Sequence, residues 1–589
     1  MLVDEILIVF VMLSLAMKHG LKHHSLKNAI VSVTATLVTG IGIGVIVSLV
    51  ASLLVTSVKK LSDYRLWMGG EFLNLPGSNG SMVPMLWLIL AALLLWGVRY
   101  LFGITRWHGP ADSIYAAHRL DNEIDVRVGT GSTLAAFISM GGGAPVGQYG
   151  PLVHFGATVG CYLRQVFGTK LIDIDVFIGC GVAAAIAAGF HAPIAGIVFA
   201  HEAILRHFSF RALTPIAISS VTSAWFATAV FGGEPIFNLA SAAPELLPMV
   251  PVLLGSGVLF GLISMLFMMT LLYATKMAGK SGFGPLPLAL SAAVTCGVIA
   301  LFVPEVLGTG SLEINNIING GYDIGFLLLL FLLKLIATSL CIGFGLFGGI
   351  FSPAAFIGAA AGGFLGKLMA FWGFAAVPAL LPIAGFAAVT AAVVGAPISV
   401  VLVVLELTQS YEFAVAAMLS AVVATFLTSL VFGHSFFDEQ LLRRGIDLSQ
   451  GRGNLELMSK DICTVVNNSF VSIPPIVTVK DAIDELVNSG SSEGYCVGNK
   501  KQFIGKISLP LLMQAPRNDI ISQHLIGNPV KLNHDASVMQ AMEIASKFIG
   551  ETIPVVEQAT NELVGVVSEA DIFEIYLATQ SRIRDLEHG

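Results

Sequence analysis

Two segments of the chain repeat one another about 200 residues apart. The first set of matches lies 202 positions apart: Pro151, Gly156, Ala157, Gly160 and Leu163 recur as Pro353, Gly358, Ala359, Gly362 and Leu365. A second set, from Gly181 to Glu202, recurs between Gly385 and Glu406 at an offset of 204 positions. Chance similarity between apolar segments does not keep glycine, proline and glutamate in the same order. The chain is therefore predicted to contain two copies of one folded unit, as many transport proteins do.

The region that holds the repeats has the composition of a membrane protein. Of the 589 residues, 55% are hydrophobic and only 12% are charged, whereas a soluble domain carries about 25% charged residues. An apolar run from about Ala29 to Val58 is followed by four more runs long enough to cross a bilayer: Val83–Phe102, Met249–Ala274, Ile324–Cys341 and Ala414–Phe432. Many shorter runs are broken by glycine and proline, and broken helices in a bilayer have to be buried in protein or line a cavity.

Other classes of function are excluded by charge and motif content. A net charge of -7 gives no general attraction for nucleic acid. The six cysteines are scattered without a C-x-x-C pair, so neither a disulfide framework nor a metal site is expected. No nucleophile motif, P-loop or H-E-x-x-H sequence is present, so we expect no catalytic residues and no enzyme activity.

The repeated motifs also suggest a site. Gly150-Pro151 and Ser352-Pro353 place a proline where a helix begins, because the first helical turn needs no proline N–H. Both helix starts would direct free backbone N–H groups and the positive end of a helix dipole toward one point. One such break alone would be an ordinary packing feature, but two in symmetric positions predict an anion site without a fixed positive charge. Such a site suits a permeant ion, which has to bind and also leave.

After Gly445 charged residues return, and the apolar runs shorten to the length of β-strands. Strands are expected at residues 470–477, 503–508, 553–557 and 563–568, with amphipathic helices at residues 479–489 and 536–547. Residues 453–589 are therefore predicted to form a soluble α/β domain.

The motifs of the membrane region resemble those of the CLC family of chloride channels and chloride/proton exchangers. Gly147-Gln148-Tyr149-Gly150-Pro151 is similar to the family's G-x-E-G-P helix start, and Gly349-Ile350-Phe351-Ser352-Pro353 to its G-x-F-x-P motif. The resemblance implies an α-helical polytopic fold with inverted repeats, here at about residues 29–232 and 249–433 of a membrane domain at residues 29–446. It also implies a homodimer with one pore in each subunit. Residues 1–28 are expected to be a cytoplasmic N-terminal segment.

The departures from the family pattern concern proton coupling. The family's gating glutamate falls at Tyr149, and no Asp or Glu occurs between Asp125 and Asp173. The inner proton glutamate of the exchangers falls at Ala203. Glu202, one residue earlier, aligns with Glu406 of the other repeat and is interpreted as a packed, hydrogen-bonded structural carboxylate.

Two anion ligands of the family are also replaced. The resemblance places His108 where the family has a serine hydroxyl, and Phe437 where it has a tyrosine hydroxyl, whereas any residue at Ile350 and Phe351 supplies a backbone N–H. His108 has two interpretations, a pore ligand or a histidine that caps a helix at the membrane interface. Tyr149 also has two, an aromatic plug or a phenol that donates to the anion.

The soluble domain resembles a pair of CBS modules, which in this family follow the membrane domain on the cytoplasmic side. The second module has the expected G-x-x-S-x-x-D motif at Gly565–Asp571, in which Ser568 would contact a phosphate and Asp571 a ribose. The first module has Leu511 at the position of the acid. One adenine nucleotide, or a purely structural dimerisation module, is expected, and no other cofactor is required.

The favoured interpretation is therefore a passive channel for chloride and other small anions, uncoupled from protons, in the plasma (inner) membrane, with both termini in the cytoplasm. The partners expected are small anions, a second copy of the chain and the lipid bilayer, and not nucleic acid. Two alternatives remain: a chloride/proton exchanger with an atypical proton path, and a poorly conducting, membrane-tethered nucleotide sensor plugged by Tyr149.

Overall fold

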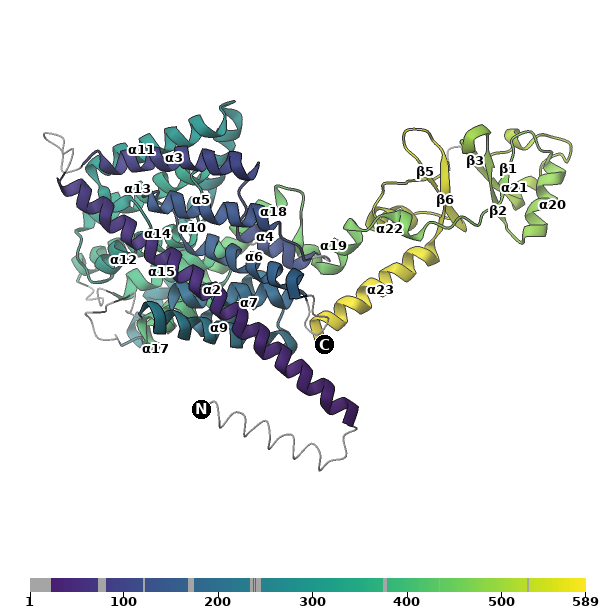
Figure 1. Cartoon of the computed structure of the whole chain (residues 1–589). Helices are drawn as coiled ribbons and strands as arrows, with labels where there is room; N and C mark the ends of the chain where they lie inside the picture. Colours follow the sequence, from purple (N-terminus) through teal and green to yellow (C-terminus); the bar gives the residue numbers. More distant parts are fainter. Residues whose placement is uncertain are drawn as a thin grey trace. The chain divides into compact units, whose positions relative to one another are not determined.

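The computed structural model describes residues 23–71, 81–119, 122–167, 174–232, 237, 239, 245–373, 379–433, 435–526 and 529–588. Of the predicted N-terminal segment 1–28, residues 1–22 lie outside this set. The chain forms two compact units that divide after Ile446, and each is described here by itself. Figure 1 shows a helical unit and a smaller unit with strands.

The helical unit contains the following helices in chain order: α2 (His23–Glu71), α3 (Val83–Phe102), α4 (Pro110–His118), α5 (Val126–Gly141), α6 (Tyr149–Phe167), α7 (Ile174–Phe190), α8 (Pro193–Phe199), the π-helix η1 (Ala200–Leu205), α9 (Phe210–Phe231), η2 (Leu247–Met249), α10 (Val250–Lys280), α11 (Pro285–Phe302), η3 (Pro304–Val306), α12 (Ser311–Ile318), α13 (Ile324–Gly343), α14 (Phe351–Phe371), α15 (Leu380–Val394), α16 (Pro397–Thr408), α17 (Tyr411–Phe432) and α18 (Phe436–Leu442).

Eight helical stretches among the described residues are long and apolar enough to cross a membrane. The predicted run Val83–Phe102 is helix α3 with the same bounds, and the runs that begin at Ile324 and near Met249 are α13 and α10. Helix α2 has 49 residues, or about 74 Å at 1.5 Å per residue, more than twice the ~30 Å hydrocarbon core of a bilayer. Figure 1 shows it as the long purple helix that crosses the helical unit.

Each of the two repeats contains a short helix that begins at a proline. Helices α8 and α16 both start at a proline, Pro193 and Pro397, and have only 7 and 12 residues. Helices α6 and α14 start two residues before Pro151 and Pro353, so both prolines lie in the first turn, where a missing N–H costs no hydrogen bond.

Glycine contacts pack the repeated helices in equivalent ways. In the first repeat Gly156 of α6 faces Gly181 of α7, and in the second Gly358 of α14 faces Gly385 of α15. A methyl group at any of the four positions would overlap the backbone of the facing helix. Glycine is therefore required for these close helix pairs, because association inside a membrane depends on van der Waals packing rather than on the hydrophobic effect.

The C-terminal unit is built from two modules with the same topology. It contains η4 (Leu448–Gln450), α19 (Gly451–Ser459), η5 (Ile462–Val465), β1 (Ser472–Ile473), α20 (Val479–Ser489), β2 (Glu493–Val497), η6 (Asn499–Lys501), β3 (Phe503–Ser508), α21 (Leu509–Leu512), η7 (Ile521–Gln523), β4 (Leu532–Asn533), α22 (Val538–Ala545), β5 (Thr552–Val556), β6 (Leu563–Ser568) and α23 (Glu569–His588). In each three-stranded sheet, β1-β2-β3 and β4-β5-β6, the first strand pairs parallel and the third antiparallel to the middle strand.

The two modules share a core. Tyr495 and Phe503 of the first module cluster with Val556, Leu563 and Val566 of the second, and all five are buried. A polar contact accompanies this cluster, because the hydroxyl of Tyr495 donates to the carbonyl of Thr552 at 3.0 Å. The modules therefore form one body rather than two tethered domains.

Candidate anion site

The two repeats meet at a pair of hydrogen bonds between equivalent glycines. The N–H of Gly147 donates to the carbonyl of Gly349 at 2.7 Å, and the N–H of Gly349 donates to the carbonyl of Gly147 at 2.6 Å. These positions are 202 residues apart, the same offset as the repeated motif. Helices α6 and α14 begin two residues after this bridge, at Tyr149 and Phe351, so their N-termini converge there as the sequence predicted.

Two buried cations hold the loops beside the bridge. Lys334 has no exposed surface, and its Nζ donates to the carbonyls of Val306 and Gly308 at 2.8 Å each. The N–H of Gly308 in turn donates to the carbonyl of Gly143 at 2.9 Å. Gly143 has a φ of +95° and lies directly against the guanidinium of Arg65, which is 4% exposed. Both cations also interact electrostatically with Glu313, so their role here is to hold these loops in place.

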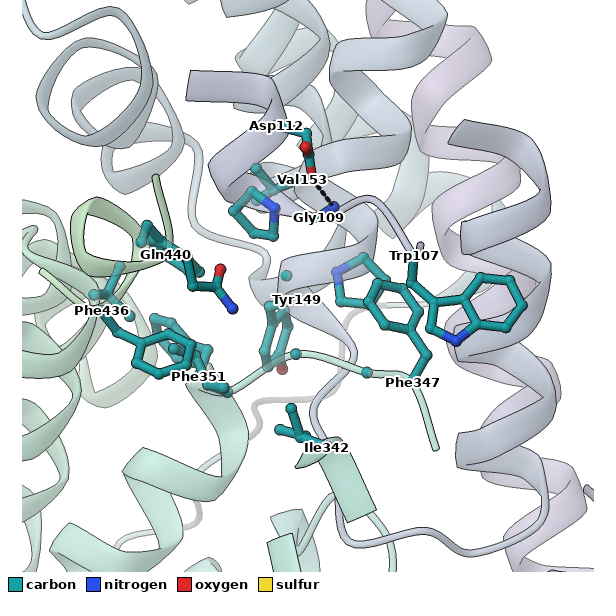
Figure 2. Close-up of a pocket in the computed structure, with 18 of the residues that line it drawn as sticks. Trp107, Gly109, Asp112, Tyr149, Val153, Ile342, Phe347, Phe351, Phe436 and Gln440 are labelled. Carbon is teal, nitrogen blue, oxygen red and sulfur yellow. Dashed lines mark hydrogen bonds between the residues drawn. The ribbon is translucent and has the colours of Figure 1, made fainter. Parts of the chain in front are cut away.

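A cavity of about 90 Å³ lies where the helix starts converge. Its wall is formed by Trp107, Gly109, Pro110, Asp112, Tyr149, Gly150, Pro151, Val153, Ile186, Phe199, Ile342, Phe347, Gly348, Gly349, Ile350, Phe351, Val394, Phe436, Phe437, Gln440 and Arg444. Figure 2 shows the ring of Tyr149 in the middle of this group. The space is several times the ~10–15 Å³ that a cavity needs to hold one water molecule, so a partly dehydrated anion fits.

The ring of Tyr149 is held between two other aromatic rings. It stacks on Phe190, the last residue of α7, with a centroid distance of 3.5 Å and an interplanar angle of 13°. Phe351 presents an edge to it at 5.4 Å, and Phe190 and Phe351 contact each other at 5.0 Å. Tyr149 is 7% exposed. The residue at the gating position is thus locked into an aromatic cluster and carries no carboxylate.

The structure brings most of the predicted site residues together. Six of them line the cavity: Tyr149, Gly150, Gly349, Ile350, Phe351 and Phe437. Gly147 lies in the bridge, and Gln148 lines a separate small apolar cavity.

His108 lies next to residues that line the cavity but is not itself part of the wall. Its neighbours Trp107 and Gly109 line the cavity, but the His108 ring lies against His154, with a centroid distance of 5.9 Å. Its backbone N–H donates to the hydroxyl of Ser132 at 2.9 Å. His108 directly precedes Gly109, the N-cap of α4, and Pro110 is the first residue of that helix.

An ion-paired cluster stands at one end of the cavity. Asp112 accepts from Arg106 at 2.7 Å and from Arg444 at 2.9 Å, and Asp112 and Arg444 both line the wall. Asp112 also caps α4 by accepting from the N–H of Gly109 at 2.9 Å. Two guanidinium groups share one carboxylate, so the cluster keeps a net positive charge and attracts anions to this entrance.

The position of the inner proton glutamate holds no titratable group. Ala203 lies in the π-helix η1, 5% exposed. Its neighbour Glu202 caps the start of α16: its carboxylate accepts from the N–H groups of Ile398 at 3.0 Å and Ser399 at 2.8 Å, and from the Ser399 hydroxyl at 2.5 Å. These contacts agree with the structural interpretation of Glu202.

Glu406 makes the same contact in the opposite direction. Its carboxylate accepts from the N–H groups of Ile194 at 3.0 Å and Ala195 at 2.8 Å, at the start of α8. Each glutamate therefore caps a broken helix of the other repeat, where it satisfies N–H groups that have no partner within their own helix.

Sequence reasoning did not find Phe190, Trp107 or Gln440. Phe190 is the last residue before the His191–Pro193 break, and the break was the only signal near it. Gln440 comes from α18, and Figure 2 shows its amide directed toward Tyr149. In the described part of the chain this amide has no hydrogen-bond partner, so it is available to a ligand in the cavity.

In the C-terminal unit, Ser568 ends β6 and Asp571 lies in the first turn of α23. Oδ2 of Asp571 accepts from the N–H of Ser568 at 2.9 Å and from its hydroxyl at 2.6 Å. The two residues are therefore adjacent and half-exposed, at the end of a strand and the start of a helix. At the equivalent end of β3, Ser508 caps α21 without a side-chain hydrogen bond, and Leu511 stands in place of the acid.

Apolar spanning helices, a duplicated unit and a cavity at converging helix N-termini define a membrane protein for the passage of anions. The sequence pattern described as voltage gated chloride channel matches residues 90–429, more than half of the chain, and the chain belongs to this family. The CBS domain pattern matches residues 519–578, the second module of the C-terminal unit. The CLC-like inverted-repeat fold with CBS modules, predicted from the sequence, is thereby confirmed.

Relatives of known name include both exchangers and channels. The chain is 32% identical over 317 residues to the H(+)/Cl(-) exchange transporter ClcA of Vibrio cholerae, a match that covers 52% of this chain and 67% of the relative. It is 27% identical over 377 residues to the voltage-gated ClC-type chloride channel ClcB of Salmonella typhimurium, which covers 61% of this chain and 89% of the relative. The family is one of anion transporters and channels rather than of enzymes.

Solved structures show the same fold. A slow cyanobacterial Cl-/H+ antiporter has a TM-score of 0.62 at 20% identity, with 69% of this chain and 97% of that chain covered. A eukaryotic CLC transporter has a TM-score of 0.59 at 18% identity, with 92% and 98% covered. The second match extends over both units of this chain.

Proposed function

We propose that this chain is a passive pathway for chloride and other small anions that does not couple their movement to protons. The observation that carries the proposal is the aromatic cluster at the gating position. A phenol titrates near pH 10 in water, so Tyr149 holds its proton throughout the physiological range. It can neither compete with chloride as an anion nor carry a proton through the membrane.

The other end of the proton route supports the same proposal. Ala203 stands at the inner glutamate position, and the adjacent carboxylate of Glu202 is occupied by three hydrogen bonds to α16. A group that carries protons has to exchange them with water or with a relay, whereas the oxygens of this carboxylate are already engaged at the start of α16.

Specific observations favour each of two other functions. Relatives such as ClcA are named as exchangers, which favours an exchanger with an atypical proton path. The close stacking of Tyr149 on Phe190 favours a poorly conducting protein whose membrane unit anchors a nucleotide sensor.

Reconstituted vesicles separate the three functions in one experiment. With a chloride gradient and a potassium–valinomycin clamp, chloride efflux and external pH are recorded together. We expect chloride efflux without uphill proton movement. Proton pumping driven by chloride would show an exchanger, and the absence of both would show a blocked pore. As a control, Tyr149→Glu places a carboxylate at the gate and should make efflux slower and pH-sensitive, because the charged form competes with chloride.

We also propose that the protein is a homodimer in the plasma (inner) membrane with both termini in the cytoplasm. Arg443 and Arg444 follow the last helix of the membrane unit, and arginine-rich flanks favour the cytoplasmic side. Cys463 is the exposed cysteine of the described C-terminal unit. A membrane-impermeant maleimide should label it in permeabilised cells and not in intact cells. Labelling of intact cells would reverse the proposed orientation.

The C-terminal unit is proposed to bind one adenine nucleotide weakly, with Asp571 as the ribose ligand. Oδ2 of Asp571 is used by Ser568, which leaves Oδ1 for a hydroxyl of a ligand. Titration calorimetry of the full-length protein with ATP, ADP and AMP tests this proposal. Asp571→Ala should abolish the heat of binding. Asp481→Ala is the control, because Asp481 makes a similar contact with the Thr478 hydroxyl at the start of another helix, α20. Equal heats for wild type and Asp571→Ala would exclude this site.

A further inference from the structure

The wall of the central cavity has few polar side chains for a site that has to receive an anion. Of its 21 residues, thirteen have apolar side chains and four are glycines. The polar or charged ones are Asp112, Tyr149, Gln440 and Arg444. Phe437 contributes a ring without a hydroxyl, and the polar atom of the Trp107 side chain is its indole N–H, which has no hydrogen-bond partner among the described residues. An anion that enters therefore exchanges many water molecules for few donors.

Besides the phenol of Tyr149 and the indole N–H of Trp107, donors come from three places. Backbone N–H groups are available at the start of α14, around Ile350 and Phe351, because the first turn of a helix leaves its N–H groups unpaired. Arg444 provides charge at the entrance, although it shares Asp112 with Arg106. The side-chain amide of Gln440 projects into the cavity toward Tyr149 (Figure 2). An amide can rotate to present its N–H₂ group, and here no other described residue occupies it.

The apolar part of the wall also interacts with an anion. Aromatic rings have a negative face and a positive edge, so rings from Phe351, Phe436 and Phe437 attract an anion only along their edges. This attraction is weak and is not directional enough to replace a complete hydration shell. For a strongly hydrated anion, the hydration free energy lost on entry is larger than the interaction free energy that such a wall provides. A large, weakly hydrated anion loses little hydration free energy.

We propose that this cavity prefers large, weakly hydrated anions such as thiocyanate and iodide over chloride, and that Gln440 is the side-chain ligand that holds the anion there. The inference deepens the proposed function, because it concerns the ion that occupies the same pathway. It does not depend on whether the ion is conducted. The selectivity follows from the wall chemistry, and the residual chloride affinity follows from the Gln440 amide together with the backbone N–H groups of α14.

Binding to the purified full-length protein tests this inference without requiring conduction. Titration calorimetry is run with sodium chloride, iodide, thiocyanate and fluoride at constant ionic strength. We expect thiocyanate and iodide to bind at least about 5-fold more tightly than chloride, and fluoride more weakly than chloride. Gln440→Leu should weaken chloride binding about 3- to 10-fold, the effect of one net hydrogen bond. It should weaken thiocyanate binding less. The control is Gln165→Leu, at an exposed position near the end of α6 and away from the cavity.

A second variant adds only one atom and keeps the packing. Phe437→Tyr supplies a hydroxyl to the wall and should move the preference toward chloride by about 3-fold. Chloride binding as tight as thiocyanate binding in the wild type would overturn the proposed selectivity. Equal chloride affinities for wild type and Gln440→Leu would overturn the role of Gln440. If thiocyanate binds as expected but vesicles pass no anion, the proposed passive pathway is wrong and the selectivity of the site stands.

Discussion

Removing the ring of Tyr149 should open the anion pathway. In the structure this ring stacks on Phe190 at 3.5 Å and receives an edge of Phe351 at 5.4 Å. Each aromatic pair contributes about 0.5–1.5 kcal/mol beyond its buried area. An anion that passes this point has to displace the ring and break both contacts, at a cost of about 1–3 kcal/mol. Tyr149→Ala removes that cost, which corresponds to a rise in chloride flux of about 5- to 150-fold.

Chloride efflux from proteoliposomes, started with valinomycin and followed with a chloride electrode, measures this rise. Tyr149→Phe keeps both ring contacts and should stay within about 2-fold of the wild type. Phe302→Ala is a control for the loss of an aromatic ring elsewhere, because Phe302 is 71% exposed at the end of α11. The same efflux rate in wild type and Tyr149→Ala would refute the reasoning, since the ring would not stand in the path. An equal rise in Tyr149→Phe would assign the block to the hydroxyl.

Three further predictions concern stability. Glu202→Ala removes three hydrogen bonds at the start of α16, each worth about 1.5–3 kcal/mol when the acceptor is charged. The thermal unfolding midpoint in detergent should therefore fall by several degrees. An unchanged midpoint would contradict the capping role. Gly156→Ala should lower the midpoint too, because its methyl group meets the α7 backbone, whereas Gly97→Ala, which faces open space, should not. Burial raises the pKa of Glu456 in the folded C-terminal unit. Between the unfolded and the folded pKa, the folded unit therefore binds more protons than the unfolded one. The stability of the unit should fall as the pH rises through that range. Hydrogen exchange of β4–β6 should show this fall in the wild type, and equal behaviour of Glu456→Gln would refute it.

Local sequence patterns were enough to predict much of the fold. The bounds of α3, α20, β3 and β6 agree with the runs read from the sequence, because hydrophobic length and periodicity are local and glycine or proline marks the ends. Strand β2 and the twenty-residue helix α23 were missed. Glu493–Val497 holds only a short apolar run, and the sequence of α23 alternates between polar and apolar residues without a strong period.

The residues of the candidate site were also predicted only in part. Tyr149, Phe351 and Phe437 were found because the motifs at these helix starts resemble those of the family. Phe190 and Gln440 were not found, since they come from the ends of α7 and α18 and meet Tyr149 only when helices distant in the sequence pack together. The contact between His108 and His154 was not predicted either, because it joins two segments that are distant in the sequence.

Glu202 and Glu406 each cap a helix of the other repeat, and this exchange of caps links the two halves of the membrane unit. In each repeat a single glutamate serves the broken helix of the other one, so a half-length chain on its own would leave its glutamate and the N–H groups of its own short helix without partners. Two identical copies of a half-length chain would solve this together, because one glutamate at one position makes both contacts when the copies face each other across a twofold axis. The present chain thus keeps, inside one polypeptide, the bonding scheme of a symmetric dimer.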